Sequence, residues 1–349
     1  MTGQSFAFSE TYAGITCNEK WIVGHSLSNQ SMAVKIASYL LVLFKIIYHL
    51  IVYPVDIVYF TGSRTLLGGF KDIVTIYTAK ALRIKVVNHL HGTALNSFFS
   101  SIPRLLRPLY LNAYRRTDVN IVLMPEMANE LRGMLGTNNI QTIANFYDKD
   151  LDGMHDKNNL NEELKIVYLS NIIKSKGIIE LLDAINICVE RKYPVRLSVA
   201  GVFFGDDLST QESIREEFES KISRTENVSY LGAVSGVTKL NLLLESDVFI
   251  LPTYYKIEAF PLSILEAMRT GNYIVTTDHN FLKTIVGDEN GRLIQKQSVD
   301  EIVSAIEEVL NDRVRLRNVQ QFNMKFVQKK YSYDRYIEKL HELFHSLLK

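Results

Sequence analysis

The segment Thr253–Gly271, TYYKIEAFPLSILEAMRTG, follows an apolar run and holds two glutamates, Glu258 and Glu266. Pro261 favours a helix start, because its fixed φ suits the first turn and that position needs no N–H donor. The backbone amides of this first turn then lack helical partners, and together with the helix dipole they form an anion site. The two carboxylates add acceptors for hydroxyl groups near that site. A phosphate flanked by hydroxyls is the chemistry of a nucleotide sugar.

Each glutamate also has a simpler interpretation. Glu266 falls outside the apolar arc of its predicted helix, which is compatible with an ordinary solvated helix residue. Glu258 is compatible with a purely electrostatic role at the helix N-terminus, which contributes about 0.3–1 kcal/mol. An acid pair of the glycosidase type is disfavoured, because eight residues of helix would separate the carboxylates by about 12 Å, beyond the roughly 6.5–9.5 Å of inverting hydrolases.

The residues EAFPLSILEAM at 258–268, followed by TGNYIVTTD at 270–278, resemble the E-x7-E segment of retaining glycosyltransferases of family 4, which have the GT-B fold. Bacterial exopolysaccharide and O-antigen glycosyltransferases are the members that this chain resembles. The resemblance implies that Glu258 lies beside the donor sugar and that Glu266 binds the ribose hydroxyls. It also implies that the backbone of four residues approaches the donor diphosphate: Ala259, Phe260, Pro261 and Leu262.

A second motif, LSNIIKSKG at 169–177, lies between an expected strand and an expected helix. Lys176 in such a loop would neutralise a diphosphate as a compact cation, and a solvated lysine before a helix is the alternative. The family pattern usually has Gly-Arg where this chain has Ser170 and Asn171, followed by Lys-Gly at Lys176 and Gly177. Asn171 can hydrogen-bond a phosphate oxygen, but it supplies no charge.

Three further positions are candidates on the same resemblance. His91, in HLHG at the end of an expected strand, matches a position near the donor sugar, although an isolated histidine there more often has a structural role. A zinc site is not indicated, because no third and fourth ligands occur at suitable spacing. Gly201 permits close backbone approach at a strand end. Gly3, in TGQS, resembles the glycine-rich loop of the family, but no apolar strand precedes it, so we expect the N-terminal sheet to lack its first strand.

Apolar runs alternate with helical patterns along most of the chain, which predicts two Rossmann-like α/β halves with parallel sheets. The expected strands are Trp21–Gly24, Ile57–Phe60, Ile84–His89, Asn120–Leu123, Lys165–Leu169, Arg196–Ala200, Val228–Leu231, Asp247–Leu251 and Tyr273–Thr276. We expect residues 1–150 to form the acceptor-side domain, completed by a C-terminal helix at 332–349 that crosses back. Residues 151–331 are the expected nucleotide-sugar domain, with a polar linker at 148–163. Ligands bind beyond the carboxyl ends of strands in such sheets, so the two facing halves would enclose a cleft.

The composition of the 349 residues, 47% hydrophobic and 22% charged, is that of a globular protein. The net charge of +1 hides an asymmetry, since residues 1–150 hold 14 Lys and Arg against 9 Asp and Glu. This basic half and the apolar stretch Ile36–Phe60 are compatible with docking on an anionic membrane surface, with core burial as the alternative. A spanning helix is not expected, because charged and polar residues interrupt the stretch. Cys17 and Cys188, far apart, indicate a reducing compartment, which predicts a cytoplasmic protein, peripheral at the inner face of the plasma membrane if it docks.

We therefore interpret the chain as a retaining, hexosyl-type glycosyltransferase. It would move a sugar from a nucleoside diphosphate donor, UDP in preference to GDP, to a hydroxyl of a glycan or lipid-linked glycan in surface polysaccharide synthesis. Glu258, His91 and Lys176 are the expected catalytic residues. No metal, other cofactor or nucleic acid is expected, because fixed cations and dipoles can stabilise the departing diphosphate. Two alternatives stay open: a nucleotide-sugar epimerase on the same fold, and a non-catalytic nucleotide-sugar-binding protein.

Overall fold

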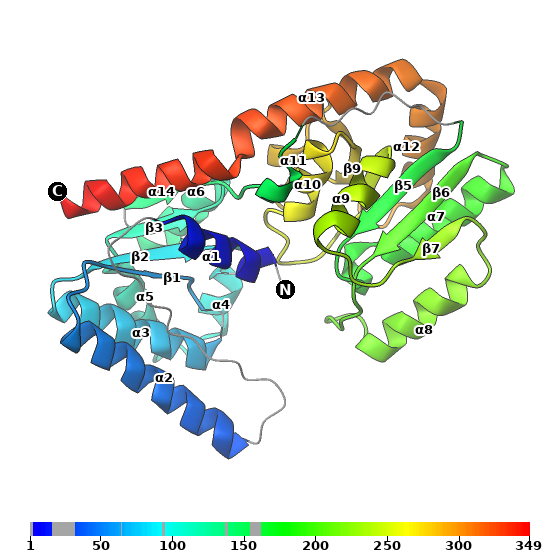
Figure 1. Cartoon of the computed structure of the whole chain (residues 1–349). Helices are drawn as coiled ribbons and strands as arrows, with labels where there is room; N and C mark the ends of the chain where they lie inside the picture. Colours follow the sequence, from blue (N-terminus) through cyan, green and yellow to red (C-terminus); the bar gives the residue numbers. More distant parts are fainter. Residues whose placement is uncertain (1–2, 16–31, 64, 93–94, 137–138, 154–161) are drawn as a thin grey trace. The chain divides into compact units, whose positions relative to one another are not determined.

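A computed structural model gives the structure of the chain and describes residues 3–15, 32–63, 65–92, 95–136, 139–153 and 162–349 (Figure 1). The chain divides into an N-terminal unit, Met1–Ala144 with Tyr336–Lys349, and a C-terminal unit, Asn145–Arg335. Each unit is an α/β structure with its own parallel sheet, as the alternating pattern predicts. The expected strand Trp21–Gly24 and residues 154–161 of the expected linker lie outside the described residues.

The described part of the N-terminal unit contains four parallel strands in the order β1-β2-β3-β4. Their bounds are β1 (Ile57–Phe60), β2 (Lys85–Leu90), β3 (Val119–Val122) and β4 (Ile140–Thr142). The helices of this unit are α1 (Gly3–Gly14), α2 (Met32–Val52), α3 (Leu66–Ala81), α4 (Leu95–Ser101), α5 (Arg107–Arg115), α6 (Pro125–Leu135) and most of the C-terminal α14 (Tyr333–Leu348). Helix α14 packs on this sheet, since the rings of Phe344 and Tyr59 on β1 lie 6.0 Å apart.

The expectation for Gly3 was wrong, because Gly3 begins α1 and does not lie in a glycine-rich loop. No glycine or proline interrupts the residues between Gly3 and Gly14, so the helix continues to its end. Ala7 and Thr11 are buried on one face of α1, and the Thr11 hydroxyl is hydrogen-bonded to the Tyr336 hydroxyl of α14. Among the residues with described structure, none before Ile57 lies in a strand.

The C-terminal unit has six parallel strands in the order β10-β9-β8-β5-β6-β7. Their bounds are β5 (Leu164–Leu169), β6 (Val195–Ala200), β7 (Val228–Tyr230), β8 (Val248–Leu251), β9 (Tyr273–Thr277) and β10 (Gly291–Ile294). The chain runs outward from β5 to β7 and then returns to β8 on the other side of β5. The strand order therefore reverses between β5 and β8, and open α/β sheets bind ligands beyond the carboxyl ends of strands at such a switch point.

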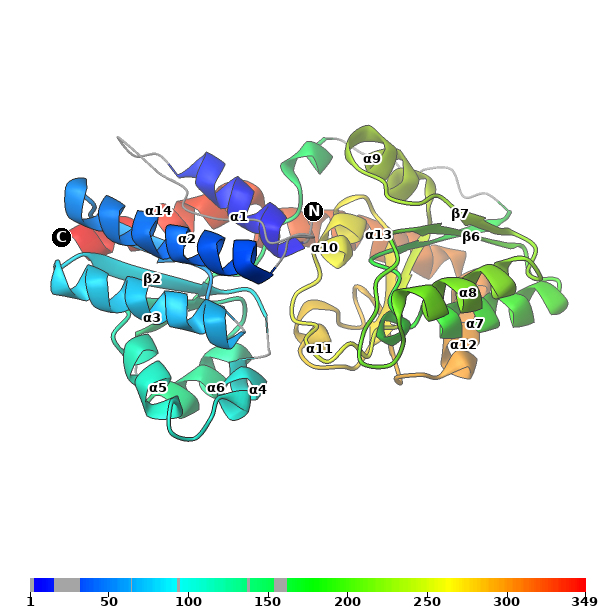
Figure 2. The ribbon, with the colours of Figure 1, turned by 90° about the horizontal axis from the view of Figure 1, so that it is seen from below.

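Helices cover both faces of this six-stranded sheet (Figure 2). Strand β8 is buried along its whole length, as a Val/Ile/Leu-rich run in a sheet covered on both faces should be. The helices are α7 (Ile178–Glu190), α8 (Gln211–Ile222), α9 (Gly236–Glu245), α10 (Leu262–Arg269), α11 (Leu282–Ile285), α12 (Val299–Asn311) and α13 (Arg313–Tyr331), with short 3-10 turns at Lys149–Leu151 and Lys174–Lys176. Apart from β4 and β10, which the sequence did not predict, each described strand begins and ends within one residue of its expected bounds.

Candidate active site

The loops at the carboxyl ends of the C-terminal strands bring the predicted residues of this unit to one edge of the sheet. The loop after β5 leads to Lys176, the loop after β6 begins at Gly201, and the loop after β8 holds Glu258. Asn280 follows β9 and donates a hydrogen bond from its side chain to the Glu258 carbonyl oxygen at 2.8 Å. Lys176 and Glu258 thus lie on the two loops that flank the switch point between β5 and β8.

Lys176 and Glu258 form an ion pair between Nζ and Oε2. Their side chains are only 11% and 9% exposed, which excludes the solvated-lysine interpretation. The Thr253 hydroxyl donates to the same carboxylate oxygen at 3.2 Å. The Lys176 ammonium also lies 5.4 Å from the centre of the Tyr255 ring. Because an ammonium has three N–H donors, the ion pair leaves Lys176 able to bind an additional anion.

The position of Lys176 depends on the glycine that follows it. Gly177 ends the 3-10 turn with φ +76°, a conformation that residues with a Cβ rarely adopt. A Cβ at this position would lie 2.2 Å from the Pro252 carbonyl oxygen. The Tyr254 N–H also donates to the Ser175 carbonyl oxygen at 2.7 Å. The loops after β5 and β8 are therefore in direct backbone contact, and this contact brings Lys176 to Glu258.

Glu266 lies on α10 and is bound by a lysine that the sequence analysis missed. Lys239 of α9 contacts Glu266 Oε1 at 2.9 Å and Asp148 Oδ2 at 2.8 Å. Glu266 is 7% exposed, so it is not a solvated helix residue. Burial raises the pKa of Glu266, and the attraction of Lys239 opposes this shift only in part. Burial would lower the pKa of Lys239, but its two carboxylate partners outweigh burial and raise it. Lys239 is thus held by two carboxylates, whereas burial remains the main influence on the pKa of Glu266.

The start of α10 presents free backbone donors. Pro261 is the N-cap and the helix begins at Leu262, one residue after the expected start. The N–H groups of Ala259, Phe260, Leu262 and Ser263 form no hydrogen bond with any described residue. The Asn145 side chain donates to the Phe260 carbonyl oxygen at 3.2 Å, which holds this loop in place. Free amides at the positive end of a helix suit a bound phosphate.

Asn171 and Gly201 lie at the ends of neighbouring strands. Asn171 is exposed, and its carbonyl oxygen accepts a hydrogen bond from the Tyr168 hydroxyl at 3.0 Å. Burial, reinforced by the charge of Glu258, raises the pKa of Tyr168 well above its usual range. A Cβ at Gly201 would lie 1.9 Å from the Ser170 carbonyl oxygen, so close packing of two backbones is enough to require glycine there.

His91 follows β2 in the N-terminal unit. Its ring stacks on His89, with 4.0 Å between the ring centres. His89 is fully buried, and its Nδ1 is hydrogen-bonded to the Tyr59 hydroxyl at 2.6 Å. Burial, with the charge of His91 next, holds the pKa of His89 well below its ordinary value. In the part of the chain that the structure covers, no group of three or more His, Cys, Asp or Glu side chains could hold a metal ion.

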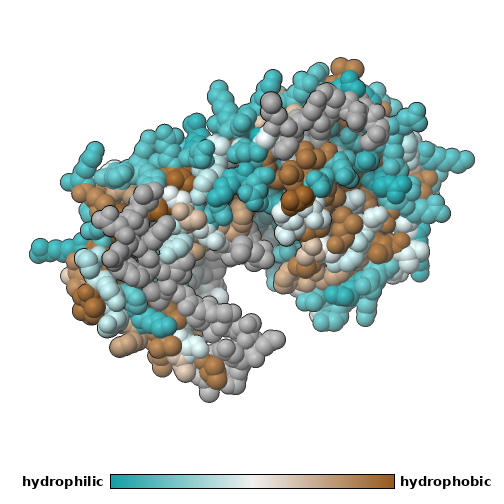
Figure 3. Space-filling view, viewed as in Figure 1, coloured by the Kyte–Doolittle hydropathy of each residue, from teal (hydrophilic) through white to brown (hydrophobic). Residues whose placement is uncertain are grey.

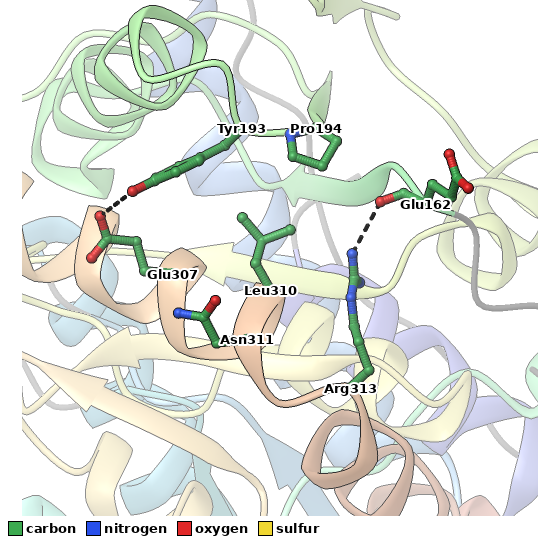
Figure 4. A pocket seen from close by; sticks show the side chains of 7 residues that line it. All are labelled: Glu162, Tyr193, Pro194, Glu307, Leu310, Asn311 and Arg313. Atoms are coloured by element: carbon green, nitrogen blue, oxygen red, sulfur yellow. Dashed lines mark hydrogen bonds between the residues drawn. The ribbon is translucent and has the colours of Figure 1, made fainter.

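A pocket of about 560 Å³ lies elsewhere in the C-terminal unit (Figure 4). Its lining residues are Glu162, Tyr193, Pro194, Glu307, Leu310, Asn311 and Arg313. Glu162 precedes β5 and Pro194 precedes β6, so the pocket lies at the amino ends of the strands, opposite the edge that carries Lys176. The Tyr193 hydroxyl donates to Glu307 at 2.8 Å, and the Arg313 guanidinium donates to the Glu162 carbonyl oxygen at 3.2 Å. This pocket is distinct from the candidate active site.

Comparison with known proteins finds a family and curated relatives that each match about half of the chain. Residues 152–327 match the family described as glycosyl transferases group 1. The capsular polysaccharide biosynthesis glycosyltransferase CapM of Staphylococcus aureus is 29% identical over 191 residues, which are 54% of this chain and 48% of CapM. The uncharacterized glycosyltransferase MJ1607 of Methanocaldococcus jannaschii is 29% identical over 178 residues, 50% of this chain and 42% of that protein. The match spans about half the length of each relative.

Solved structures with the GT-B fold resemble the chain over most of its length. Anabaena HepE in complex with UDP has a TM-score of 0.72 at 16% identity, covering 91% of this chain and 85% of HepE. Sucrose-phosphate synthase from Thermosynechococcus elongatus has a TM-score of 0.68 at 18% identity, covering 95% and 86%. S. aureus TarM, in a complex that contains UDP, has a TM-score of 0.66 at 18% identity, covering 87% and 59%. These likenesses confirm the predicted fold, two α/β domains with parallel sheets. Because the family match covers half of the chain and includes both glutamates, this chain belongs to the group 1 glycosyl transferases.

Proposed function

We propose that the chain transfers a glycosyl group from a UDP-sugar to a hydroxyl of a glycan or lipid-linked glycan, with retention of anomeric configuration, as a member of glycosyltransferase family 4. The observation that carries this proposal is the pair of buried lysine–glutamate contacts beside the free amides of α10, at the switch point of the C-terminal sheet. The relation to CapM favours an acceptor in surface polysaccharide synthesis. UDP is present in the HepE and TarM complexes, which favours it as the nucleotide.

Each group of the donor has a proposed partner. The α10 amides and Lys176 would bind the diphosphate, because they supply fixed positive charge where phosphate oxygens need it. Glu266, held by Lys239, would accept hydrogen bonds from the ribose hydroxyls. Glu258 would contact the donor sugar, and its own carboxylate is already oriented by Lys176 and Thr253. No resident metal enters this scheme.

In the proposed reaction, the bond between the anomeric carbon and the phosphate oxygen breaks while a bond to the acceptor oxygen forms on the same face. The acceptor proton passes to the departing phosphate oxygen. As the bond to the anomeric carbon breaks, and before the proton arrives, negative charge grows on the diphosphate, where Lys176 and the α10 amides would stabilise it. Because Asn171 is uncharged, Lys176 would provide more of this stabilisation than in relatives with an arginine. For His91, in the N-terminal unit, a role near the donor sugar stays a prediction.

Transfer assays with a series of UDP-sugars and lipid-linked or free glycan acceptors test this proposal, with the anomeric configuration of the product read by NMR. Glu258→Gln should lower kcat by about 100-fold or more, the size of effect seen when a transition-state contact is removed. UDP affinity should change by less than about threefold, because the contact is with sugar and not nucleotide. Glu307→Gln, at the opposite edge of the sheet, is the matched control and should keep full activity. Equal losses of turnover and UDP affinity in Glu258→Gln would remove the proposed role.

The exposed, uncharged Asn171 keeps a non-catalytic binding protein as a second candidate. Tight UDP-sugar binding with neither transfer nor hydrolysis, for every acceptor tried, would favour that candidate. Incubation with the donor alone addresses the epimerase alternative, because an epimerase would produce an isomeric UDP-sugar without any acceptor.

A further inference from the structure

Helix α2 of the N-terminal unit is apolar on two opposite faces. Val42 and Leu50 are buried, and α2 packs against α3. The other face is exposed to solvent; Phe44 and Ile51 at its centre are each 64% exposed. The exposed residues of this face, named the α2 stripe, are Leu40, Leu41, Phe44, Tyr48, Ile51 and Val52. Their spacing of mostly three or four residues places them on one side of the helix.

The apolar surface continues beyond α2. Leu67 and Phe70, at the start of α3, are also exposed. The Tyr39 hydroxyl of α2 donates a hydrogen bond to the Leu67 carbonyl oxygen, so the start of α3 lies directly beside α2. In Figure 1, α2 lies on the side of α3 away from the sheet, and Figure 3 shows apolar side chains open to solvent along this edge of the unit. Exposed apolar side chains thus lie both on α2 and at the neighbouring start of α3.

A surface of this kind requires an apolar partner. Helices at a water-facing surface normally carry polar residues on the outer face, and large contiguous apolar patches mark interaction sites. No described residue covers the α2 stripe. None of the helices that the structure describes has both the length and the apolar character needed to cross a bilayer. The stripe therefore fits a partner that lies against the side of the helix.

Charge identifies the partner. Helix α2 carries Lys35, Lys45 and His49 and no acidic residue. The N-terminal unit, 1–144 with 336–349, holds 15 Lys and Arg against 9 Asp and Glu, a net charge of +6. Two copies packed through the stripe would bring two such units together, whereas an anionic lipid surface attracts them. Tyr48, in the stripe, carries the combination of apolar ring and polar hydroxyl that is enriched at membrane interfaces.

We propose that the α2 stripe is the surface through which this chain docks on an anionic lipid bilayer, with α2 lying in the plane of the interface. Apolar side chains would enter the boundary between headgroups and acyl chains, and Lys45 would stay among the anionic headgroups. This inference rests on the N-terminal unit alone and is independent of the donor chemistry proposed above.

Sedimentation of the full chain with lipid vesicles tests the proposal. One set of vesicles contains phosphatidylcholine alone, and the other contains about one third phosphatidylglycerol as the anionic lipid. We expect binding to the anionic vesicles that weakens as salt is raised. Phe44→Glu should reduce this binding about tenfold or more, because it removes a central apolar group and adds a charge that the bilayer interior excludes. Val314→Glu is the matched control, since Val314 is at least as open to solvent, at 72% exposure, but lies in the C-terminal unit; it should bind like the unchanged chain.

Three results would overturn the docking proposal. One is the absence of binding to anionic vesicles, and another is equal binding by the Phe44→Glu chain. The third is a concentration-dependent dimer that Phe44→Glu dissociates, which would assign the stripe to a second copy of the chain. UDP titration of the Phe44→Glu chain should match that of the unchanged chain, because Phe44 lies in the other unit from Glu266. This titration separates failure of docking from failure of the proposed function.

Discussion

Removing either charge of the Lys176–Glu258 pair should destabilise the C-terminal unit. Removing both charges together should cost less free energy of unfolding than the sum of the two single changes. Lys176→Met keeps the length of the side chain and removes its charge, which leaves the Glu258 carboxylate with the Thr253 hydroxyl as its side-chain partner. Glu258→Gln keeps the shape of the side chain and leaves the Lys176 ammonium without a counter-charge. The double variant removes both charges and leaves no unpaired ion behind.

The expected magnitudes follow from the burial of the pair. Removing one partner of a buried ion pair costs about 3–5 kcal/mol. About a tenth of each side chain still meets water, so we expect the lower end, about 3 kcal/mol, for Lys176→Met. Glu258→Gln should cost about 2 kcal/mol, because the Tyr255 ring stabilises the remaining ammonium and the lysine can extend toward water. The double variant should lose about 2 kcal/mol, which gives a coupling free energy of about 3 kcal/mol.

Urea unfolding followed by far-UV circular dichroism measures the free energy of unfolding of the four proteins. Because the chain has two units, the transitions are fitted separately, and hydrogen exchange in β5 and β8 identifies the transition of the C-terminal unit. Additive effects, with a coupling below about 0.5 kcal/mol, would show that the two charges do not depend on each other and would refute this reasoning.

Three further predictions follow from single positions. UDP affinity should fall as the pH decreases through the pKa of Glu266, because the ionised carboxylate is the acceptor for the ribose hydroxyls. Burial raises this pKa above that of an ordinary glutamate. Calorimetric titration across pH should find no such fall in Glu266→Gln. Gly177→Ala should lower the free energy of unfolding by about 2 kcal/mol or more, since it combines a positive φ with a clash against the Pro252 carbonyl oxygen. An unchanged urea midpoint would contradict this expected loss of stability. Cys188 is fully buried, and burial, with the charge of Glu307 next, raises the pKa of its thiol to about 11. In a Cys17→Ser background it should therefore react with a disulfide reagent at pH 8 about 100-fold more slowly than the urea-unfolded chain does, and equal rates would contradict its burial.

The C-terminal half of the fold was predictable because its signals are local. The apolar runs that became β5, β6, β8 and β9 are each bounded by turn or helix residues, and their bounds lie within one residue of the prediction. Strands β4 (Ile140–Thr142) and β10 (Gly291–Ile294) escaped prediction, since IQT and GRLI are short and partly polar and are held in place by neighbouring strands. Local sequence carries little trace of such tertiary support.

The candidate site was predictable in part for the same reason. Glu258, Glu266 and Lys176 stand in local motifs at the ends of strands. The Lys239–Glu266 contact joins residues 27 positions apart, and the Lys239–Asp148 contact joins residues 91 apart, so no spacing rule relates them. One signal was available: Lys239 is the single charged residue among the first nine positions of a largely apolar helix. A lysine in that setting needs a buried partner.

Calorimetric titration of the purified chain with UDP measures whether the switch-point edge of the C-terminal sheet is a nucleotide-sugar site. Glu266→Ala removes a carboxylate of that site, and Glu307→Ala, at the pocket on the opposite edge, is the matched control. We expect micromolar UDP binding by the unchanged chain and by Glu307→Ala, and binding at least about tenfold weaker by Glu266→Ala, because the ribose hydroxyls lose their charged acceptor. Equal UDP affinities in all three folded proteins, or no binding by the unchanged chain, would contradict this expectation.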